Sequence, residues 1–294
     1  MTVEVPLRVG FVGLGDIGKP MALRLAGAAN VELTVFDLEP APLVELAATG
    51  AGVAASVAAL AEVEVVCVMV RNDDQVRSVL TELLAAIEAA DGAAVRAVVV
   101  HSTVAPTTPA ELAASAASAG IAIVDAPVSG GAMGANAGTL AIMAGGGDEA
   151  FDLVRPVLAA MASKVVHAGP LGAGTKFKLA RNLMHFVAFT AATEAQRLAE
   201  AAGLDLLALG DVVRHTDAVT GGPGAIMHRP TSAPIPADDF WFDVFAHVRA
   251  LGEKDLRFAV ELADELGVET PLARIALDRF GTGLGLPADP AERP

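Results

Sequence analysis

The chain has 294 residues, more than one ordinary domain needs, and 53% of them are hydrophobic while 19% are charged. The formal net charge of −15 argues against a nucleic-acid partner, because binding to phosphates requires a basic surface. Residues 1–6 lack the basic and apolar segments of a secretory signal, and the uncharged stretch 126–147 is too rich in glycine to span a bilayer. We therefore expect a cytoplasmic protein of two domains that contacts no membrane.

Short apolar runs alternate with helical stretches through the first half of the chain. Strands are predicted at 7–12, 32–36, 63–70, 97–101, 121–124 and 140–144, and helices at 19–28, 42–48, 74–90 and 109–119. The strand runs are continuously apolar, which is typical of parallel strands buried on both faces, and Cys67 lies inside one of them. This alternation predicts an α/β fold with a Rossmann-type doubly wound parallel sheet.

The pattern changes after about residue 170. A long helix without internal Pro or Gly is predicted at about 175–202, and more helical sequence follows a Gly/Pro-rich connection at 221–236. We therefore expect a dinucleotide-binding domain over 1–170 and an all-α C-terminal domain over 171–294. The second domain is expected to contribute to substrate binding and to oligomerisation.

A glycine-rich turn directly follows the first predicted strand and opens the first predicted helix. Its residues are Gly13, Leu14, Gly15, Asp16, Ile17 and Gly18. The first glycine permits a tight turn, the second lets a pyrophosphate approach the backbone, and the third allows close helix–strand packing. Because the helix N-terminus also offers unpaired N–H groups, we expect these residues to bind a dinucleotide. The alternative is an ordinary glycine-rich turn.

Asp37 ends the second predicted strand, at the spacing expected for a ribose-binding carboxylate. A carboxylate there accepts hydrogen bonds from ribose hydroxyls and repels a 2′-phosphate. No Arg follows it directly. The sequence therefore favours NAD as the cofactor, with NADP still possible.

Three further segments make the interpretation more specific. The first is Asp125-Ala126-Pro127-Val128-Ser129-Gly130-Gly131, the second runs from Gly172 through Lys178 to Asn182, and the third is Lys254-Asp255-Leu256. With these segments the chain resembles the β-hydroxyacid dehydrogenases, the family of 3-hydroxyisobutyrate dehydrogenase, from Val9 to about Leu256. The resemblance implies a nicotinamide-dependent oxidoreductase that acts on a small β-hydroxyacid or its semialdehyde.

The resemblance implies that Lys178 is the general acid/base and that Asn182, one helical turn later, orients the substrate. The chemistry agrees, since hydride transfer to or from a carbonyl carbon requires a proton to move as well. A partly desolvated lysine with a lowered pKa can move that proton. The alternative is a surface lysine on an amphipathic helix, the role that we expect for Lys176.

Ser129, Gly130 and Gly131 are the candidate substrate-binding loop. Such a loop can present a hydroxyl and successive backbone N–H groups to a carboxylate. Taken alone, the loop could equally be a plain turn. We expect a small carboxylate substrate to bind there.

Further cofactor contacts are expected from residues that follow other strands. Val70 and Arg71 end the third predicted strand, where ligands of open α/β sheets bind. Thr103, in His101-Ser102-Thr103 after the fourth predicted strand, matches the Ser-Thr pair that the resembled family has near the nicotinamide. Lys254 is expected to reach the cofactor or substrate from the helical domain, as the matching lysine of the family does. The alternative for Lys254 is a surface charge.

The chain departs from the family pattern at five positions, of which Ile17, where Met is usual, is a conservative change. Arg24 and Arg71 stand where Asn and Pro are usual, Arg181 replaces the first of two Asn after the catalytic Lys, and His185 stands where an aliphatic residue is common. Arg181 and His185 could reshape the substrate pocket, although His185 could equally be a packed helix residue. The identity of the substrate therefore stays open.

Two other functions are alternatives to a hydroxyacid dehydrogenase: an imine reductase and a non-catalytic nucleotide-binding module. The imine-reductase branch of the same superfamily generally lacks a Lys at the catalytic position, so Lys178 counts against it. A non-catalytic nucleotide-binding module would be expected to have lost that lysine.

The six histidines show no metal-ligand spacing, so no metal site is expected. We expect a homodimer or homotetramer.

Overall fold

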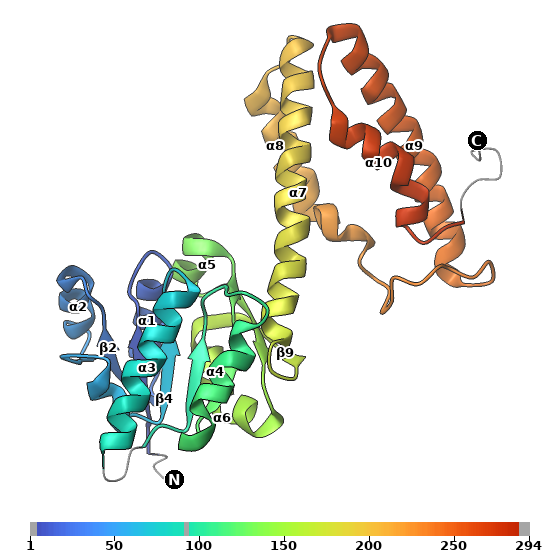
Figure 1. The fold of residues 1–294 in the computed structure, drawn as a ribbon. Coiled ribbons are helices and arrows are strands. Elements are labelled where there is room, and N and C mark those ends of the chain that lie inside the picture. Colours follow the sequence, from blue (N-terminus) through green and yellow to red (C-terminus); the bar gives the residue numbers. More distant parts are fainter. Residues whose placement is uncertain (1–4, 91–93, 288–294) are drawn as a thin grey trace. The chain divides into compact units, whose positions relative to one another are not determined.

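The computed structural model describes residues 5–90 and 94–287. The chain divides into two compact units, Met1–Arg181 and Asn182–Pro294, and the division falls inside helix α7 (Ala173–Ala201). Figure 1 shows strands and helices in the first unit and helices in the second. Each unit is described below by itself.

Within the described residues, the first unit is built on a nine-stranded sheet in the order β3-β2-β1-β4-β5-β6-β8-β7, with β9 paired to β8. The strands are β1 (Leu7–Val12), β2 (Val31–Phe36), β3 (Gly52–Val53), β4 (Val65–Val68), β5 (Ala97–Val100), β6 (Ala122–Asp125), β7 (Val128–Ser129), β8 (Leu140–Gly145) and β9 (Ala162–Gly169). All pairings from β3 to β6 are parallel. The predicted doubly wound arrangement is therefore confirmed for this part of the sheet.

Helices cover both faces of the sheet (Figure 1). They are α1 (Gly18–Ala26), α2 (Pro40–Ala47), α3 (Asp73–Ala89), α4 (Thr108–Ala116), α5 (Gly131–Ala137) and α6 (Asp148–Met161). Residues of α1 and α6 join one buried apolar cluster with one face of the sheet, and residues of α3 and α4 join a second cluster with the other face. The valines of β4 and β5 are buried because each strand contributes side chains to both clusters.

The far part of the sheet differs from the prediction. We expected residues 140–144 to form another parallel strand, but β8 runs antiparallel to β6 and to β7. The chain returns through the seven-residue helix α5, which is too short for the crossover that a parallel neighbour requires. The sequence analysis also missed α6 and β9. Most of β9 is only half-buried, so its apolar pattern is weak.

The second unit is helical, as predicted. Beyond α7 it contains α8 (Leu206–Thr220), α9 (Phe240–Leu266) and α10 (Pro271–Gly283). The buried carboxylate of Glu194, on α7, accepts hydrogen bonds from the first amides of α10, Leu272 N at 2.8 Å and Ala273 N at 2.9 Å. It thereby satisfies N–H groups that a helix leaves without a partner. Among the described residues, no helix is long and apolar enough to cross a membrane.

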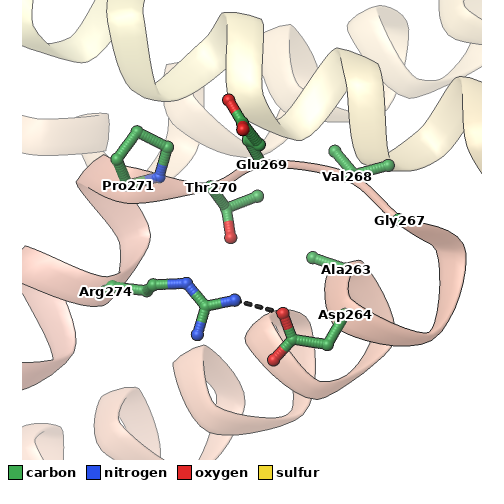
Figure 2. Close-up of a pocket in the computed structure, with 8 residues that line it drawn as sticks. All are labelled: Ala263, Asp264, Gly267, Val268, Glu269, Thr270, Pro271 and Arg274. Atoms are coloured by element: carbon green, nitrogen blue, oxygen red, sulfur yellow. Dashed lines mark hydrogen bonds and ion pairs between the residues drawn. The ribbon is translucent and has the colours of Figure 1, made fainter.

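A hollow of about 470 Å³ lies where α9 ends and α10 begins (Figure 2). Arg274 and Asp264 form an ion pair across it, and apolar side chains such as Val268 line its wall. None of the residues that the sequence predicts for the site lines this hollow.

Candidate cofactor and catalytic site

The predicted site residues of the first unit follow strands that end at one edge of the sheet. Strands β1, β2, β4, β5 and β6 are parallel neighbours, so their carboxyl ends share that edge. The glycine-rich turn follows β1, Asp37 follows β2, Arg71 comes shortly after β4, and Thr103 comes shortly after β5. The chain order reverses between β1 and β4, where open α/β sheets bind their ligands.

The three glycines of the turn have different reasons to lack a side chain. Gly13 has a φ of +94°, and a Cβ there would lie 2.2 Å from the carbonyl oxygen of Met69. A Cβ at Gly18 would lie 2.0 Å from the carbonyl oxygen of Gly13. A Cβ at Gly15 would meet nothing within 4 Å. Backbone packing therefore explains why residues 13 and 18 are glycines, whereas the glycine at position 15 leaves open space above the turn.

The start of α1 provides hydrogen-bond donors for an anion. No side chain caps this helix, and its first turn contains no acidic residue. Among the described residues, no acceptor is bound by the backbone N–H of Gly15 or Asp16, and both residues are exposed. Free N–H groups, a helix N-terminus and the space above Gly15 together fit the pyrophosphate of a dinucleotide.

Asp37 is tied to the glycine-rich turn. Its Oδ2 accepts a hydrogen bond from the backbone N–H of Leu14, and its Oδ1 accepts one from Glu39 N at 2.8 Å. The carboxylate therefore fixes the turn to the end of β2. Each oxygen keeps a second lone pair, so the half-exposed carboxylate can still accept from ribose hydroxyls.

Ser102 links the loops that carry Arg71 and Thr103. Its buried hydroxyl donates to Val70 O at 2.8 Å and accepts from Val70 N at 2.9 Å. Arg71 and Thr103 themselves are exposed. Val70, Arg71 and Thr103 are the predicted cofactor contacts of these loops, and the link that Ser102 makes to Val70 is a contact that the sequence pattern does not show.

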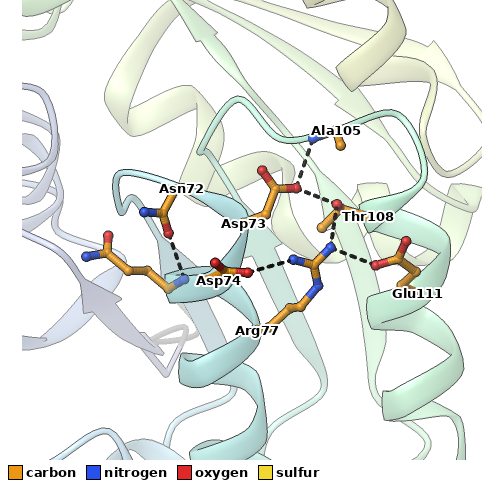
Figure 3. Close-up of polar contacts among 8 residues, drawn as sticks. Asn72, Asp73, Asp74, Arg77, Ala105, Thr108 and Glu111 are labelled. Carbon is orange, nitrogen blue, oxygen red and sulfur yellow. Dashed lines mark hydrogen bonds and ion pairs between the residues drawn. The ribbon is translucent and has the colours of Figure 1, made fainter.

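A second link between these loops is a polar network around Asp73 (Figure 3). The Asp73 carboxylate accepts from Ala105 N at 2.9 Å and from the hydroxyl of Thr108. Arg77 lies between Asp74, at 3.2 Å, and Glu111, at 2.8 Å. The network joins the start of α3 to the start of α4 and so fixes the loop that follows Thr103.

The predicted substrate-binding loop forms a turn that leads into α5. Ser129 ends β7, and the exposed Gly130 and Gly131 have φ of +129° and +59°. Both glycines adopt conformations that other residues rarely tolerate. At the far end of α5, the Arg24 guanidinium donates to Asn136 O. Arg24, which departs from the family pattern, therefore ties α5 to the helix that follows the glycine-rich turn.

Lys178 is only 8% exposed although it is a lysine, and lies in the part of α7 that belongs to the first unit. Burial lowers the pKa of its ammonium group, and the positive charge of Arg181 lowers it further. Lys176 is exposed, as the sequence predicts. A buried lysine with a lowered pKa can exchange a proton with a ligand more readily than a surface lysine can.

His101 directly follows β5, and its side chain is fully buried. Its Nδ1 lies 2.9 Å from the carbonyl oxygen of Ala126, so Nδ1 carries the proton and donates. Among the described residues, its Nε2 has no hydrogen-bond partner. Burial lowers the pKa of His101 to about 4, so the ring is neutral at physiological pH. The sequence analysis assigned no role to this histidine.

Two predicted site residues belong to the second unit. Asn182 is the first residue of that unit, on α7, and Lys254 lies on α9. Lys254 is exposed, and its Nζ lies 3.2 Å from Asp255 Oδ1. Their roles stay predictions. Within residues 5–90 and 94–287, no group of three or more His, Cys, Asp or Glu side chains is arranged to hold a metal ion.

Known proteins resemble the chain over nearly its whole length. The family model described as the NAD binding domain of 6-phosphogluconate dehydrogenase matches residues 8–169. The model described as NAD-binding of NADP-dependent 3-hydroxyisobutyrate dehydrogenase matches residues 172–284. Both parts of the chain therefore match models of NAD-binding proteins.

Individual relatives agree with these models. The chain is 48% identical to an uncharacterized oxidoreductase of Mycobacterium tuberculosis, over 97% of this chain and 95% of the relative. It is 36% identical to a probable 3-hydroxyisobutyrate dehydrogenase of the same species, over 92% of this chain and 90% of the relative. A candidate oxidoreductase of Mycobacterium avium has a solved structure that matches with a TM-score of 0.90 and 44% identity, covering 96% of this chain and 100% of the other. The chain is therefore an oxidoreductase of the β-hydroxyacid dehydrogenase family.

Proposed function

We propose that the protein transfers hydride between a nicotinamide cofactor and the β-carbon of a small β-hydroxyacid or its semialdehyde, with Lys178 as the general acid/base. The observation that supports this most strongly is the burial of Lys178, at 8% exposure, in the compact unit that also contains the glycine-rich turn. Keeping a lysine out of water is unfavourable, and a catalytic role gives a reason for it.

In the oxidation direction, the neutral amine of Lys178 takes the proton of the β-hydroxyl as the carbonyl forms. In the reduction direction, its ammonium form returns that proton to the carbonyl oxygen. The lowered pKa of Lys178 makes its neutral form more accessible than that of a surface lysine. A bound nicotinamide cofactor accepts or supplies the hydride at the β-carbon.

The substrate carboxylate is proposed to bind at Ser129, Gly130 and Gly131. The exposed backbone of this loop and the Ser129 hydroxyl offer hydrogen-bond donors to an anion. A local site of this kind is needed because the net charge of −15 disfavours long-range attraction of anions. Asn182, one helical turn after Lys178, is proposed to orient the substrate.

We propose NAD as the preferred cofactor. Its pyrophosphate would bind at the turn 13–18, and its adenosine ribose would bind at Asp37, whose negative charge disfavours a 2′-phosphate. Val70, Arg71 and Thr103 would contact the cofactor farther along the sheet edge, and Lys254 would reach cofactor or substrate from the second unit. By analogy with the family, the protein is proposed to work as a homodimer or homotetramer.

The test is a dehydrogenase assay with NAD and with NADP against 3-hydroxyisobutyrate, 3-hydroxypropionate, glycerate and bulkier β-hydroxyacids. Lys178→Ala is expected to bind NAD almost normally and to lose on the order of 10² to 10⁴ in kcat. Lys176→Ala is the matched control, because this exposed lysine lies two residues away on the same helix. Turnover of no β-hydroxyacid by the wild type, or near-normal turnover by Lys178→Ala, would contradict the proposal.

A further inference from the structure

Asp125 is a buried carboxylate that caps the helix carrying Lys178. It ends β6 and is only 1% exposed. Its Oδ1 accepts a hydrogen bond from Gly172 N at 2.7 Å, and its Oδ2 accepts one from Thr175 N at 2.6 Å. These amides lie just before and inside the first turn of α7, where a helix has N–H groups without partners.

The surrounding backbone is packed too closely to let this carboxylate move. A Cβ on Gly145 would lie 2.5 Å from Asp125 Oδ1 and 2.7 Å from Gly174 N. A Cβ on Gly174 would lie 2.2 Å from Met143 O and 2.4 Å from Asp125 O. Strands β6 and β8 therefore contact the start of α7 directly, with no side chain between them.

A carboxylate suits this position better than an amide does. Both of its oxygens accept hydrogen bonds, whereas one arm of an Asn side chain would present a donor to a second donor. Its charge also interacts favourably with the positive end of the α7 dipole. These contacts offset part of the cost of burying the carboxylate, and burial still raises the pKa of Asp125 above its ordinary value.

Asp125 connects two parts of the proposed active site. Lys178 lies three residues after Thr175 on the same helix, and Ser129 lies four residues after Asp125 along the chain. We propose that Asp125 is a positioning residue that fixes Lys178 relative to the substrate-binding loop. The inference rests on the proposed function, because it gives Lys178 the role of general acid/base. Asp125 itself takes no part in proton transfer.

The test is Asp125→Asn, which preserves size and one acceptor oxygen. Its kcat is expected to fall on the order of 10- to 100-fold, because a small displacement of a reacting group has effects of this size. Its dissociation constant for NAD is expected to stay within about twofold of the wild-type value. The limb of its pH–kcat/KM profile that belongs to Lys178 should move upward, because a displaced lysine is less desolvated. General loss of folded protein would lower kcat without moving that limb.

Asp205→Asn is the matched control. Asp205 caps α8, a helix that carries none of the proposed site residues, and its Oδ1 alone accepts from Leu207 N at 2.8 Å and from Ala208 N at 3.1 Å. Asn at this position loses the charge and keeps the acceptor, so this variant is expected to keep its kcat and pH profile. Gly145→Ala is a second test variant, since its methyl group would force the Asp125 carboxylate and the backbone at the start of α7 apart without changing any ionisable group.

The outcomes separate this inference from the proposed function. If Lys178→Ala is inactive while folded Asp125→Asn or Gly145→Ala keeps wild-type kcat and pH profile, the positioning role is overturned and the catalytic role stands. If Lys178→Ala stays active, the proposed function itself fails. Hydrogen exchange of the wild-type protein tests the inference without any variant. The amides of Gly172 and Thr175 are expected to exchange slowly, and rapid exchange of both would overturn the inference.

Discussion

The carboxylate of Asp37 accepts a hydrogen bond from the backbone N–H of Leu14, so the end of β2 holds the glycine-rich turn in place. One side chain therefore has two roles at the proposed cofactor site. It fixes the backbone that would receive the pyrophosphate, and it places a negative charge where the adenosine ribose would bind. The two roles can be separated by a substitution that removes the charge and keeps an acceptor.

We expect Asp37→Asn to shift the cofactor preference from NAD toward NADP. The Asn oxygen can still accept from Leu14 N, and the exposed Glu39 N that loses its acceptor can bond to water. The turn should therefore keep its shape, while the repulsion of a 2′-phosphate is lost. The ratio of kcat/KM for NADP to that for NAD should rise about tenfold, which corresponds to about 1.4 kcal/mol. Glu39→Gln, an exposed change of the same charge two residues later, is the control and should leave the ratio unchanged. A wild-type enzyme that prefers NADP would contradict the assignment.

The glycines of the turn should respond differently to alanine. Gly15→Ala is expected to fold with nearly wild-type stability, because the added Cβ meets nothing within 4 Å. The same methyl group would occupy the space for the pyrophosphate, so the dissociation constant for NAD should rise at least about tenfold. Gly13→Ala should instead unfold more easily by more than about 1 kcal/mol, because it requires both a positive φ and a clash with Met69 O. Calorimetry measures both quantities, and equal effects of the two variants would contradict this division of roles.

The sequence predicted those parts of the site that depend on local pattern. The turn 13–18 was found because its glycines follow a strand and precede a helix within a few residues. The catalytic role of Lys178 is predicted from the resemblance and stays a prediction, and the burial of its side chain gives a physical reason to expect it. The parallel core of the sheet was found because its strands are apolar on both faces.

The remaining features depend on contacts between distant residues. The sequence motif that contains Asp125 does not indicate a role for it, because its partners Gly172 and Thr175 lie 47 and 50 residues further along the chain. The hydroxyl of Ser102 bonds a residue 32 positions earlier. The antiparallel direction of β8 follows from the short return through α5, which the apolar pattern of residues 140–144 does not encode.

The network around Asp73 should give a pH-dependent contribution to stability. Burial raises the pKa of Asp73, but the hydrogen bonds from Thr108 and Ala105 and the charge of Arg77 more than offset this, so its pKa is lower than in the unfolded chain. A carboxyl with a lowered pKa stabilises the fold fully above its unfolded pKa of about 3.9, and this stabilisation is lost as the pH falls through the folded value. Asp73→Asn should therefore lower the free energy of unfolding by about 1 kcal/mol at pH 7.

The difference between wild type and Asp73→Asn is expected to shrink when the pH is lowered below about 4. Denaturant unfolding at a series of pH values measures it. Asp152→Asn is the control, because Asp152 is exposed and lies 3.8 Å from Arg155 in a surface pair that should contribute little at any pH. A difference that stayed constant from pH 7 to acid pH would show that the charge of Asp73 does not stabilise the fold.

Arg181 should tune the pH dependence of turnover through Lys178. Oxidation requires the neutral amine of Lys178, so kcat/KM for a β-hydroxyacid should rise with pH through its pKa and level off below the value of about 10.4 typical of a free lysine. Burial and the charge of Arg181 both lower this pKa. Arg181→Gln removes the second effect, so the limb should move upward. The same change at the exposed Lys176 should leave the limb in place. If the limb were unmoved in Arg181→Gln and persisted in the residual activity of Lys178→Ala, the titrating group would have to be a residue other than Lys178.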